Sequence, residues 1–148
     1  MTNGDKVSAD YLASLKQAEV ENYKVLAALE TIRVNQFVPF SLHVMKTSGS
    51  DTTSQVIETD PLESGYVYIV TTISAVDYTD AAHQIRLGVH QGDGYYVYES
   101  ATVAAIGDSV EYVGQLMCKE TDRIFANFLS IGENDEIHLF INGYKIKR

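Results

Sequence analysis

HQIRLGVHQGDGYYVYES, residues 83–100, contains two β-forming runs around a glycine-rich centre. Ile85, Leu87 and Val89 occupy alternate positions of the first run, which is the period of a strand with one buried face. The second run is rich in tyrosine, which favours strands. Between them, Gly92-Asp93-Gly94 offers glycines for the positive φ angles of a tight turn. The stretch predicts a β-hairpin.

Similar β-rich segments continue through the chain after residue 35. With the two runs above they make eight expected strands, and the other six lie at residues 37–46, 55–59, 66–76, 109–118, 123–129 and 136–146. The linkers are too short for the helical crossovers that parallel strands need. We therefore predict a mainly β chain with an antiparallel eight-stranded jelly-roll-like sandwich. An immunoglobulin-like sandwich is the structural alternative, although its Cys–Trp–Cys framework is absent.

Before residue 35 the apolar spacing is helical. Residues 8–34 contain no glycine or proline, Ser8 or Asp10 offers an N-cap, and Pro39 follows the segment. We expect one long N-terminal helix. The predicted division is a helix for oligomerisation or docking at residues 1–34 and a β-sandwich domain at residues 35–148.

One side of this helix carries an apolar stripe with an asparagine in its middle. In heptad terms, position a holds Leu15, Asn22 and Leu29, and position d holds Ala18, Val25 and Ile32. Leucine at a with β-branched residues at d favours trimers or tetramers, whereas a buried asparagine at a fixes the register and is best attested for dimers. Leu26 and Ala28 widen the apolar face, so we expect a parallel homo-oligomer, with a trimer favoured. Packing of the helix on its own β body and insertion into a different protein remain open.

The composition excludes two classes of partner. Eleven basic and twenty acidic residues among 148 give a formal charge of −9, which repels phosphate backbones and anionic lipids. We predict no nucleic-acid partner and no membrane partner. The N-terminus lacks a signal-peptide pattern, so we expect synthesis in a cytoplasm without export. Cys118 is the single cysteine and is expected to be a buried, inert thiol.

No motif of catalysis is present. GxSxG is absent, and the glycines near residue 92 lack the lysine and hydroxyl residue of a phosphate loop. His83 and His90 are seven residues apart, which on one strand places them on opposite faces, so no zinc site is expected. GENDEI at residues 132–137 does not match a calcium loop and is interpreted as a solvated turn. We predict a non-enzyme without metal or cofactor; a hydrolase with carboxylates assembled in space ranks last.

Three tyrosines flank the glycine turn. Tyr95, Tyr96 and Tyr98 are candidates for a ligand-stacking surface, with Tyr96 and Tyr98 expected on one strand face. Aromatic residues are equally expected as strand formers and interface anchors. The alternative function is therefore a carbohydrate- or receptor-binding β-sandwich module.

The order of segments from residue 55 to 146 resembles small jelly-roll structural proteins of tailed-bacteriophage virions, of the head-decoration or head-fibre type. The likeness lies in an apolar strand after a proline and a glycine, Ile85-Arg86-Leu87-Gly88-Val89 before a glycine-rich hairpin, an acidic turn from Lys119 to Asp122, and a last strand ending at Gly143-Tyr144. Jelly rolls of the tumour necrosis factor-like or lectin kind share these features. The resemblance implies a non-enzymatic virion protein made in the host cytoplasm, commonly trimeric, whose further partner is the major capsid protein or another virion protein.

Overall fold

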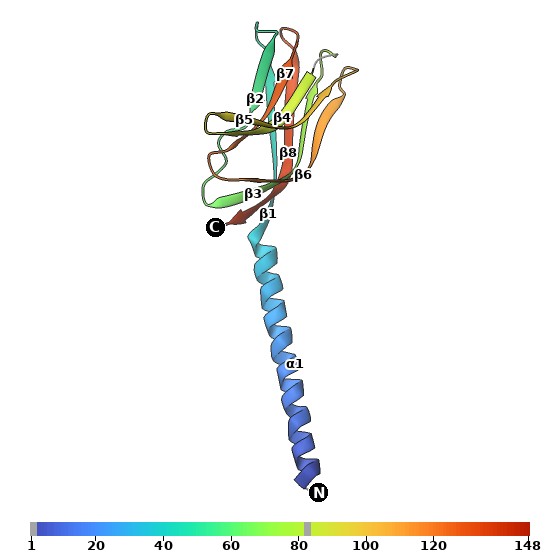
Figure 1. Cartoon of the computed structure of the whole chain (residues 1–148), viewed down its shortest axis with the longest axis vertical. Coiled ribbons are helices and arrows are strands. Elements are labelled where there is room, and N and C mark those ends of the chain that lie inside the picture. Colours follow the sequence, from blue (N-terminus) through green and yellow to red (C-terminus); the bar gives the residue numbers. More distant parts are fainter. Residues whose placement is uncertain (1–2, 82–83) are drawn as a thin grey trace. The chain divides into compact units, whose positions relative to one another are not determined.

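The computed structural model describes the backbone of residues 3–81 and 84–148 and the side chains of residues 9–29, 36–81 and 84–148. Within this part of the chain, one helix precedes eight strands (Figure 1). Their bounds are α1 Asn3–Gln36, β1 Phe37–Thr47, β2 Ser54–Glu58, β3 Tyr66–Asp77, β4 Gln84–Gln91, β5 Gly94–Thr102, β6 Ser109–Cys118, β7 Arg123–Leu129 and β8 Glu136–Lys147. The chain divides into two compact units, the first ending at Gln36 and the second beginning at Phe37.

The N-terminal helix is longer than predicted. It begins at Asn3, so the expected cap at Ser8 or Asp10 is wrong. Residues of capping type also occur inside a helix when nothing before them stops it, and the Ser14 hydroxyl donates a hydrogen bond to the Asp10 carbonyl 3.0 Å away. Of the described residues, none forms a helix with the length and apolarity that a bilayer crossing requires.

The eight strands form two four-stranded antiparallel sheets, as predicted. The strand orders are β1-β8-β3-β6 and β2-β7-β4-β5. β4 pairs with β5, β3 with β6, β2 with β7 and β1 with β8, so the chain folds back on itself at the β4–β5 turn. This nested pairing gives a jelly-roll-like sandwich. The β4–β5 hairpin, Gln84–Thr102, is the tip of the folded ribbon.

The β4–β5 turn uses its two glycines differently. Gln91 pairs with Gly94, which leaves Gly92 and Asp93 as a two-residue loop. Gly92 has a φ of 57°, as the first central position of a type II′ turn requires. The expectation that Gly94 also supplies a positive φ is wrong. A Cβ at Gly94 would lie 3.0 Å from the Tyr96 ring, which is exposed and can move aside.

The core lies between the two sheets and follows the strand alternation. In β4, Ile85, Leu87 and Val89 are buried while Arg86 is exposed. β4 therefore presents one apolar face to the opposite sheet. The largest fully buried side chains are Phe125, Phe128, Ile73, Ile85, Leu87, Ile124, Ile137, Leu139 and Ile141. Burial of this many aliphatic and aromatic side chains supplies the main stabilising term for the β body.

Candidate interaction surfaces

The predicted oligomer stripe lies on α1. Within α1 itself, the side chains of Leu15, Val25 and Leu29 are exposed. The heptad spacing places Ala18 and Asn22 on the same side of the helix. Among the described residues, none forms a hydrogen bond with the Asn22 side chain. Ile32, the last predicted contact, lies outside the described side chains.

Polar pairs border that stripe on one side, because Glu21 precedes Asn22 and occupies heptad position g. Lys24 Nζ lies 3.2 Å from Glu21 Oε1, and the Gln17 amide donates to the same carboxylate oxygen 3.1 Å away. Pairs with this i, i+3 or i, i+4 spacing stabilise an exposed helix by roughly 0.2–0.5 kcal/mol each. Exposed apolar residues also lie outside the stripe, among them Val20 and Tyr23.

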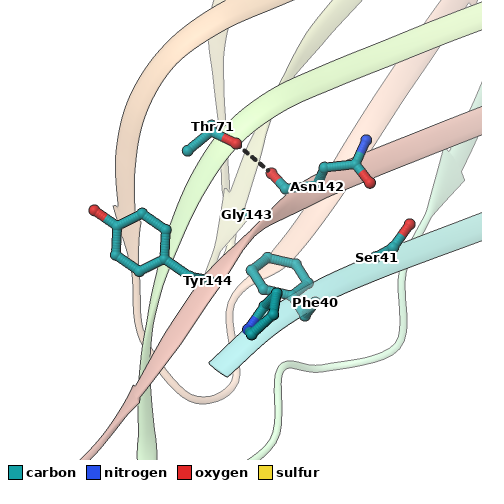
Figure 2. A pocket seen from close by; sticks show the side chains of 7 residues that line it. Phe40, Ser41, Thr71, Asn142, Gly143 and Tyr144 are labelled. Atoms are coloured by element: carbon teal, nitrogen blue, oxygen red, sulfur yellow. Dashed lines mark hydrogen bonds between the residues drawn. The ribbon is translucent and has the colours of Figure 1, made fainter. Parts of the chain in front are cut away.

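The face of the β1-β8-β3-β6 sheet that points away from the core has a shallow hollow of about 480 Å³ (Figure 2). Pro39 and Tyr144 form part of its lining, and the Thr71 hydroxyl donates to the Asn142 carbonyl 3.1 Å away. A Cβ at Gly143 would overlap the Ile69 carbonyl oxygen, so only glycine fits there. The lining carries no charged side chain.

Two histidines that lie 95 residues apart in the sequence meet on this same outer face. His43 Nε2 and His138 Nδ1 lie 2.8 Å apart, and His138 Nε2 lies 2.7 Å from Glu136 Oε1. A hydrogen bond between the rings requires that one of the two facing nitrogens carry the hydrogen and that the other accept it. His43 also stacks on Phe140 with the ring centroids 4.5 Å apart. Sequence reasoning missed this pair, because nothing local indicates that β1 lies beside β8. His83, which was expected not to form a zinc site with His90, lies outside the described residues.

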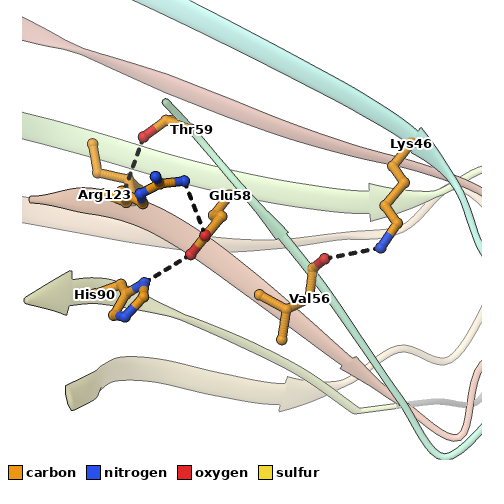
Figure 3. A network of polar contacts seen from close by, with 7 residues as sticks. Lys46, Val56, Glu58, Thr59, His90 and Arg123 are labelled. Atoms are coloured by element: carbon orange, nitrogen blue, oxygen red, sulfur yellow. Dashed lines mark hydrogen bonds and ion pairs between the residues drawn. The ribbon is translucent and has the colours of Figure 1, made fainter. Parts of the chain in front are cut away.

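The outer face of the β2-β7-β4-β5 sheet carries a polar network (Figure 3). The Glu58 carboxylate contacts His90 Nδ1 at 2.9 Å and Arg123 Nη1 at 3.2 Å. His90 in turn stacks on Tyr95, with centroids 4.0 Å apart. The network therefore holds the Tyr95 ring in position at the start of β5.

The three predicted stacking residues lie in different surroundings. Tyr95 meets the Phe125 ring edge-on at 4.9 Å on the outer face, whereas Tyr98 contacts Tyr112 of β6 in the other sheet. Tyr96 is exposed and lies over Gly94. A hollow of about 360 Å³ beside Tyr95 is lined by Val56, Arg86, Tyr95, Val97, Phe125 and Asn127. Its aromatic, guanidinium and amide groups are of the kinds that contact sugars, and sugar binding there stays a prediction.

The acidic turn between β7 and β8 is only partly solvated. Asp135 is 4% exposed, which corrects the expectation of a solvated turn at this residue. Its carboxylate accepts a hydrogen bond from the Gly132 N–H at 2.7 Å, and its own N–H donates to the Ser48 hydroxyl at 2.8 Å. Burial raises the pKa of Asp135; the negative charge of Asp77 and a side-chain hydrogen bond with it act in the same direction, while the Gly132 N–H opposes the shift. The carboxyl groups of Asp77 and Asp135 are both buried, so this pair of acids is not accessible from the surface.

Asp135→Asn is expected to stabilise the β body at pH 7. Because the folded state raises the pKa of Asp135, its contribution to stability is complete below the ordinary value of 3.8 and is lost as the pH rises through the folded value. The amide keeps an acceptor for Gly132 and removes the charge. We expect a gain of about 1 kcal/mol at pH 7 that shrinks toward pH 4, measured by thermal unfolding. Glu133→Gln, an exposed acid in the same turn, is the control; a lower stability of Asp135→Asn at pH 7 would contradict the assignment.

Cys118 is buried, as predicted. Burial, followed by the nearby charge of Asp122, raises the pKa of its thiol to about 12, so the thiolate needed for reaction is scarce at neutral pH. Within the described side chains of residues 9–29, 36–81 and 84–148, no group of three or more His, Cys, Asp or Glu residues is placed to hold a metal ion.

The fold resembles several solved structures, and two of them are a phage capsid chain and a pilus chain. A chain of the acid-stable capsid structure of Helicobacter pylori bacteriophage KHP30 matches with a TM-score of 0.54 at 11% identity, covering 75% of this chain and 90% of that one. A chain of the disulfide-linked pili that form Bacillus endospore appendages matches with a TM-score of 0.44 at 15% identity, covering 76% and 88%. At these identities the likeness concerns the fold, and the second match is too distant to support an argument. No protein-family model matches the sequence, and no curated protein sequence matches it.

Proposed function

We propose that this chain is a non-enzymatic structural component of a phage particle, a capsid decoration or head-fibre protein that acts as a homo-oligomer. The observation that carries the proposal is the shared fold of the β body and a chain of a phage capsid, over 90% of that chain. An appended helix with an apolar stripe supplies a means of joining copies or docking on the particle. The virion is the proposed location, and another virion protein such as the major capsid protein is the proposed further partner.

The helix is the proposed oligomer contact, and a trimer is the favoured state. Leu15, Val25 and Leu29 are exposed apolar residues spaced to form a seam between parallel helices. Leucine at a and β-branched residues at d favour more than two strands. Asn22 lies in the middle of the seam, where its amide groups bond one another only when the helices are in register. Its role is to align identical chains at some loss of stability.

Purified particles of the phage that encodes this chain provide the direct test. Quantitative mass spectrometry should find the chain in a fixed ratio to the major capsid protein, and the ratio should survive washing at high salt. A ratio that corresponds to a multiple of three copies per attachment site supports the trimer. Absence of the chain from particles, while it is abundant in the infected cell, would contradict the proposal.

A further inference from the structure

A hollow on the outer face of the β2-β7-β4-β5 sheet combines an aromatic wall with hydrogen-bond donors. Its lining consists of Val56, Arg86, Tyr95, Val97, Phe125 and Asn127. In β4, Gly88 lies between Arg86 and His90 on this face and adds no side chain, which leaves a gap beside the Tyr95 ring. The volume of about 360 Å³ is enough for a small ligand, since such sites span roughly 300–1,000 Å³.

The Tyr95 ring is held in place as one wall of the hollow. One of its faces stacks on His90 with the centroids 4.0 Å apart, and the Glu58 carboxylate holds His90 at 2.9 Å (Figure 3). Phe125 packs against the same ring edge-on, with the centroids 4.9 Å apart. Tyr95 nevertheless remains 50% exposed. A ring that is already immobilised loses little conformational freedom when a ligand packs on its exposed surface.

Apart from the Tyr95 hydroxyl, which can donate or accept, the polar groups of the hollow are hydrogen-bond donors. The Ser54 hydroxyl donates to Asn127 Oδ1 at 2.7 Å, which leaves the Asn127 amide nitrogen to donate to a ligand. The Arg86 guanidinium is a planar fork of N–H donors. Among the described residues, its hydrogen-bond acceptor is the Gln84 side-chain oxygen, 3.4 Å away. A ligand that fits these groups must supply acceptor oxygens.

Arg86 has no acidic partner, although the chain contains twenty acidic and eleven basic residues. The other two arginines with described side chains each contact a glutamate. Arg123 Nη1 lies 3.2 Å from Glu58 Oε1, and Arg148 Nη1 lies 3.9 Å from Glu120 Oε1. No described carboxylate forms an ion pair with Arg86. Its guanidinium therefore stays available for a carboxylate of a ligand, which it can bind through two parallel hydrogen bonds.

We propose that this hollow binds an acidic sugar, a saccharide unit that carries a carboxylate. The carboxylate binds the Arg86 guanidinium, and a hydroxyl or ring oxygen accepts from the Asn127 amide. The apolar C–H face of the sugar packs on Tyr95. A neutral sugar leaves Arg86 without a partner of opposite charge, and an acidic peptide lacks the rigid ring that fits against Tyr95. This binding site goes beyond the proposed structural role and does not depend on it.

The formal charge of −9 opposes an acidic ligand mainly at long range. In 0.15 M salt, exposed charges farther apart than about 8 Å are largely screened from each other. Within the lining of the hollow, the charged residue is Arg86. Glu58, the acidic residue that strand alternation places on the same face, is already paired with Arg123. A carboxylate that enters the hollow therefore meets a positive site.

A glycan array probed with the full chain tests the site. The probes are oligomers of galacturonic, glucuronic and sialic acid beside their methyl esters, because esterification removes the charge and keeps the sugar rings. At least one acidic oligomer should bind saturably, and its ester should bind on the order of tenfold more weakly. Absence of saturable binding to every acidic oligomer, or equal binding of acid and ester, would overturn the proposal. So would equally tight binding of tetraglutamate, because the sugar ring would then contribute nothing.

Substitutions in the hollow assign the binding to these residues. Arg86→Gln removes the charge, and Asn127→Asp keeps an acceptor for Ser54 while it repels the ligand carboxylate; each should weaken binding roughly tenfold. Arg148→Gln, on an arginine outside the hollow, is the matched control and should bind as the unmodified chain does. Equal affinities of Arg86→Gln and Arg148→Gln would place the ligand elsewhere and contradict the assignment. Thermal unfolding of each variant confirms that it is folded.

The test separates this site from the proposed oligomer. The change Leu15→Asp with Leu29→Asp alters α1 and leaves the lining of the hollow intact. Calorimetry of this variant with the acidic oligomer selected on the array should give the same affinity per chain as the unmodified protein. Loss of assembly with unchanged binding therefore supports both proposals, whereas a particle component that binds no acidic sugar would leave the structural role standing and overturn the site.

Discussion

Replacing Gly143 with alanine is expected to lower the unfolding free energy of the β body by roughly 3 kcal/mol, at the upper end of the range for overpacked sites. Gly143 lies in β8 between β1 and β3, and an added Cβ would overlap the Ile69 carbonyl oxygen and come within 3.0 Å of the Phe40 ring. The Ile69 carbonyl belongs to a strand backbone and cannot rotate aside. A fall in melting temperature of roughly 10 °C or more should follow.

Near-UV circular dichroism of the tyrosines measures this effect on the β body, because all of them except Tyr11 and Tyr23 follow residue 36. Gly49→Ala is the control. A Cβ there would lie 3.8 Å from the Gln55 amide nitrogen, an ordinary contact. Equal melting temperatures for Gly143→Ala and Gly49→Ala would show that β8 has more room beside β3 than the structure indicates.

The double change Leu15→Asp and Leu29→Asp is expected to reduce the assembled protein to single chains. Each substitution places an unpaired carboxylate in the proposed seam, where desolvation costs several kcal/mol per charge. Without partners, an isolated helix of this kind is also marginal in water, so helical circular dichroism should fall. Size-exclusion chromatography and far-UV spectra measure both effects.

Val20→Asp with Tyr23→Asp is the matched double control on the same helix. Both side chains are exposed, and the heptad places them away from the seam. The control should keep the assembled mass of the unmodified protein.

Asn22→Leu adds a test of register, since it should raise thermal stability while broadening the distribution of oligomeric states. If Asn22→Leu lowers stability at unchanged mass, Asn22 does not set the register.

The strands and the helix were predictable from the sequence because their signals are local. Alternation in β4 and the absence of glycine and proline from residues 8–34 are each visible within one element. The pairing of β1 with β8 is not visible in this way, because these strands lie about 100 residues apart in sequence and no local pattern encodes their contact. The His43–His138 contact follows from that pairing and was missed for the same reason.

Two features of the surfaces could not be predicted from the sequence, because they depend on the tertiary structure. Asp135 looks like a solvated acid in a polar turn, yet it is buried, and its N–H donates a hydrogen bond to Ser48, which lies 87 residues earlier in the sequence. Tyr95, Tyr96 and Tyr98 were recognisable as unusual aromatic residues. Only the strand order shows that they lie on an uncovered edge strand, and only the ring contacts show that Tyr95 and Tyr98 face different sheets.

The absolute mass of the unmodified full-length protein, measured by light scattering over a range of concentrations, tests the central claim most directly. Self-association through α1 predicts a stable species at three times the mass of one chain, which is 16.4 kDa. The Leu15→Asp and Leu29→Asp variant should then give the mass of one chain, and the Val20→Asp and Tyr23→Asp control should keep the mass of three. A single-chain mass for the unmodified protein at every concentration would contradict the proposed oligomer.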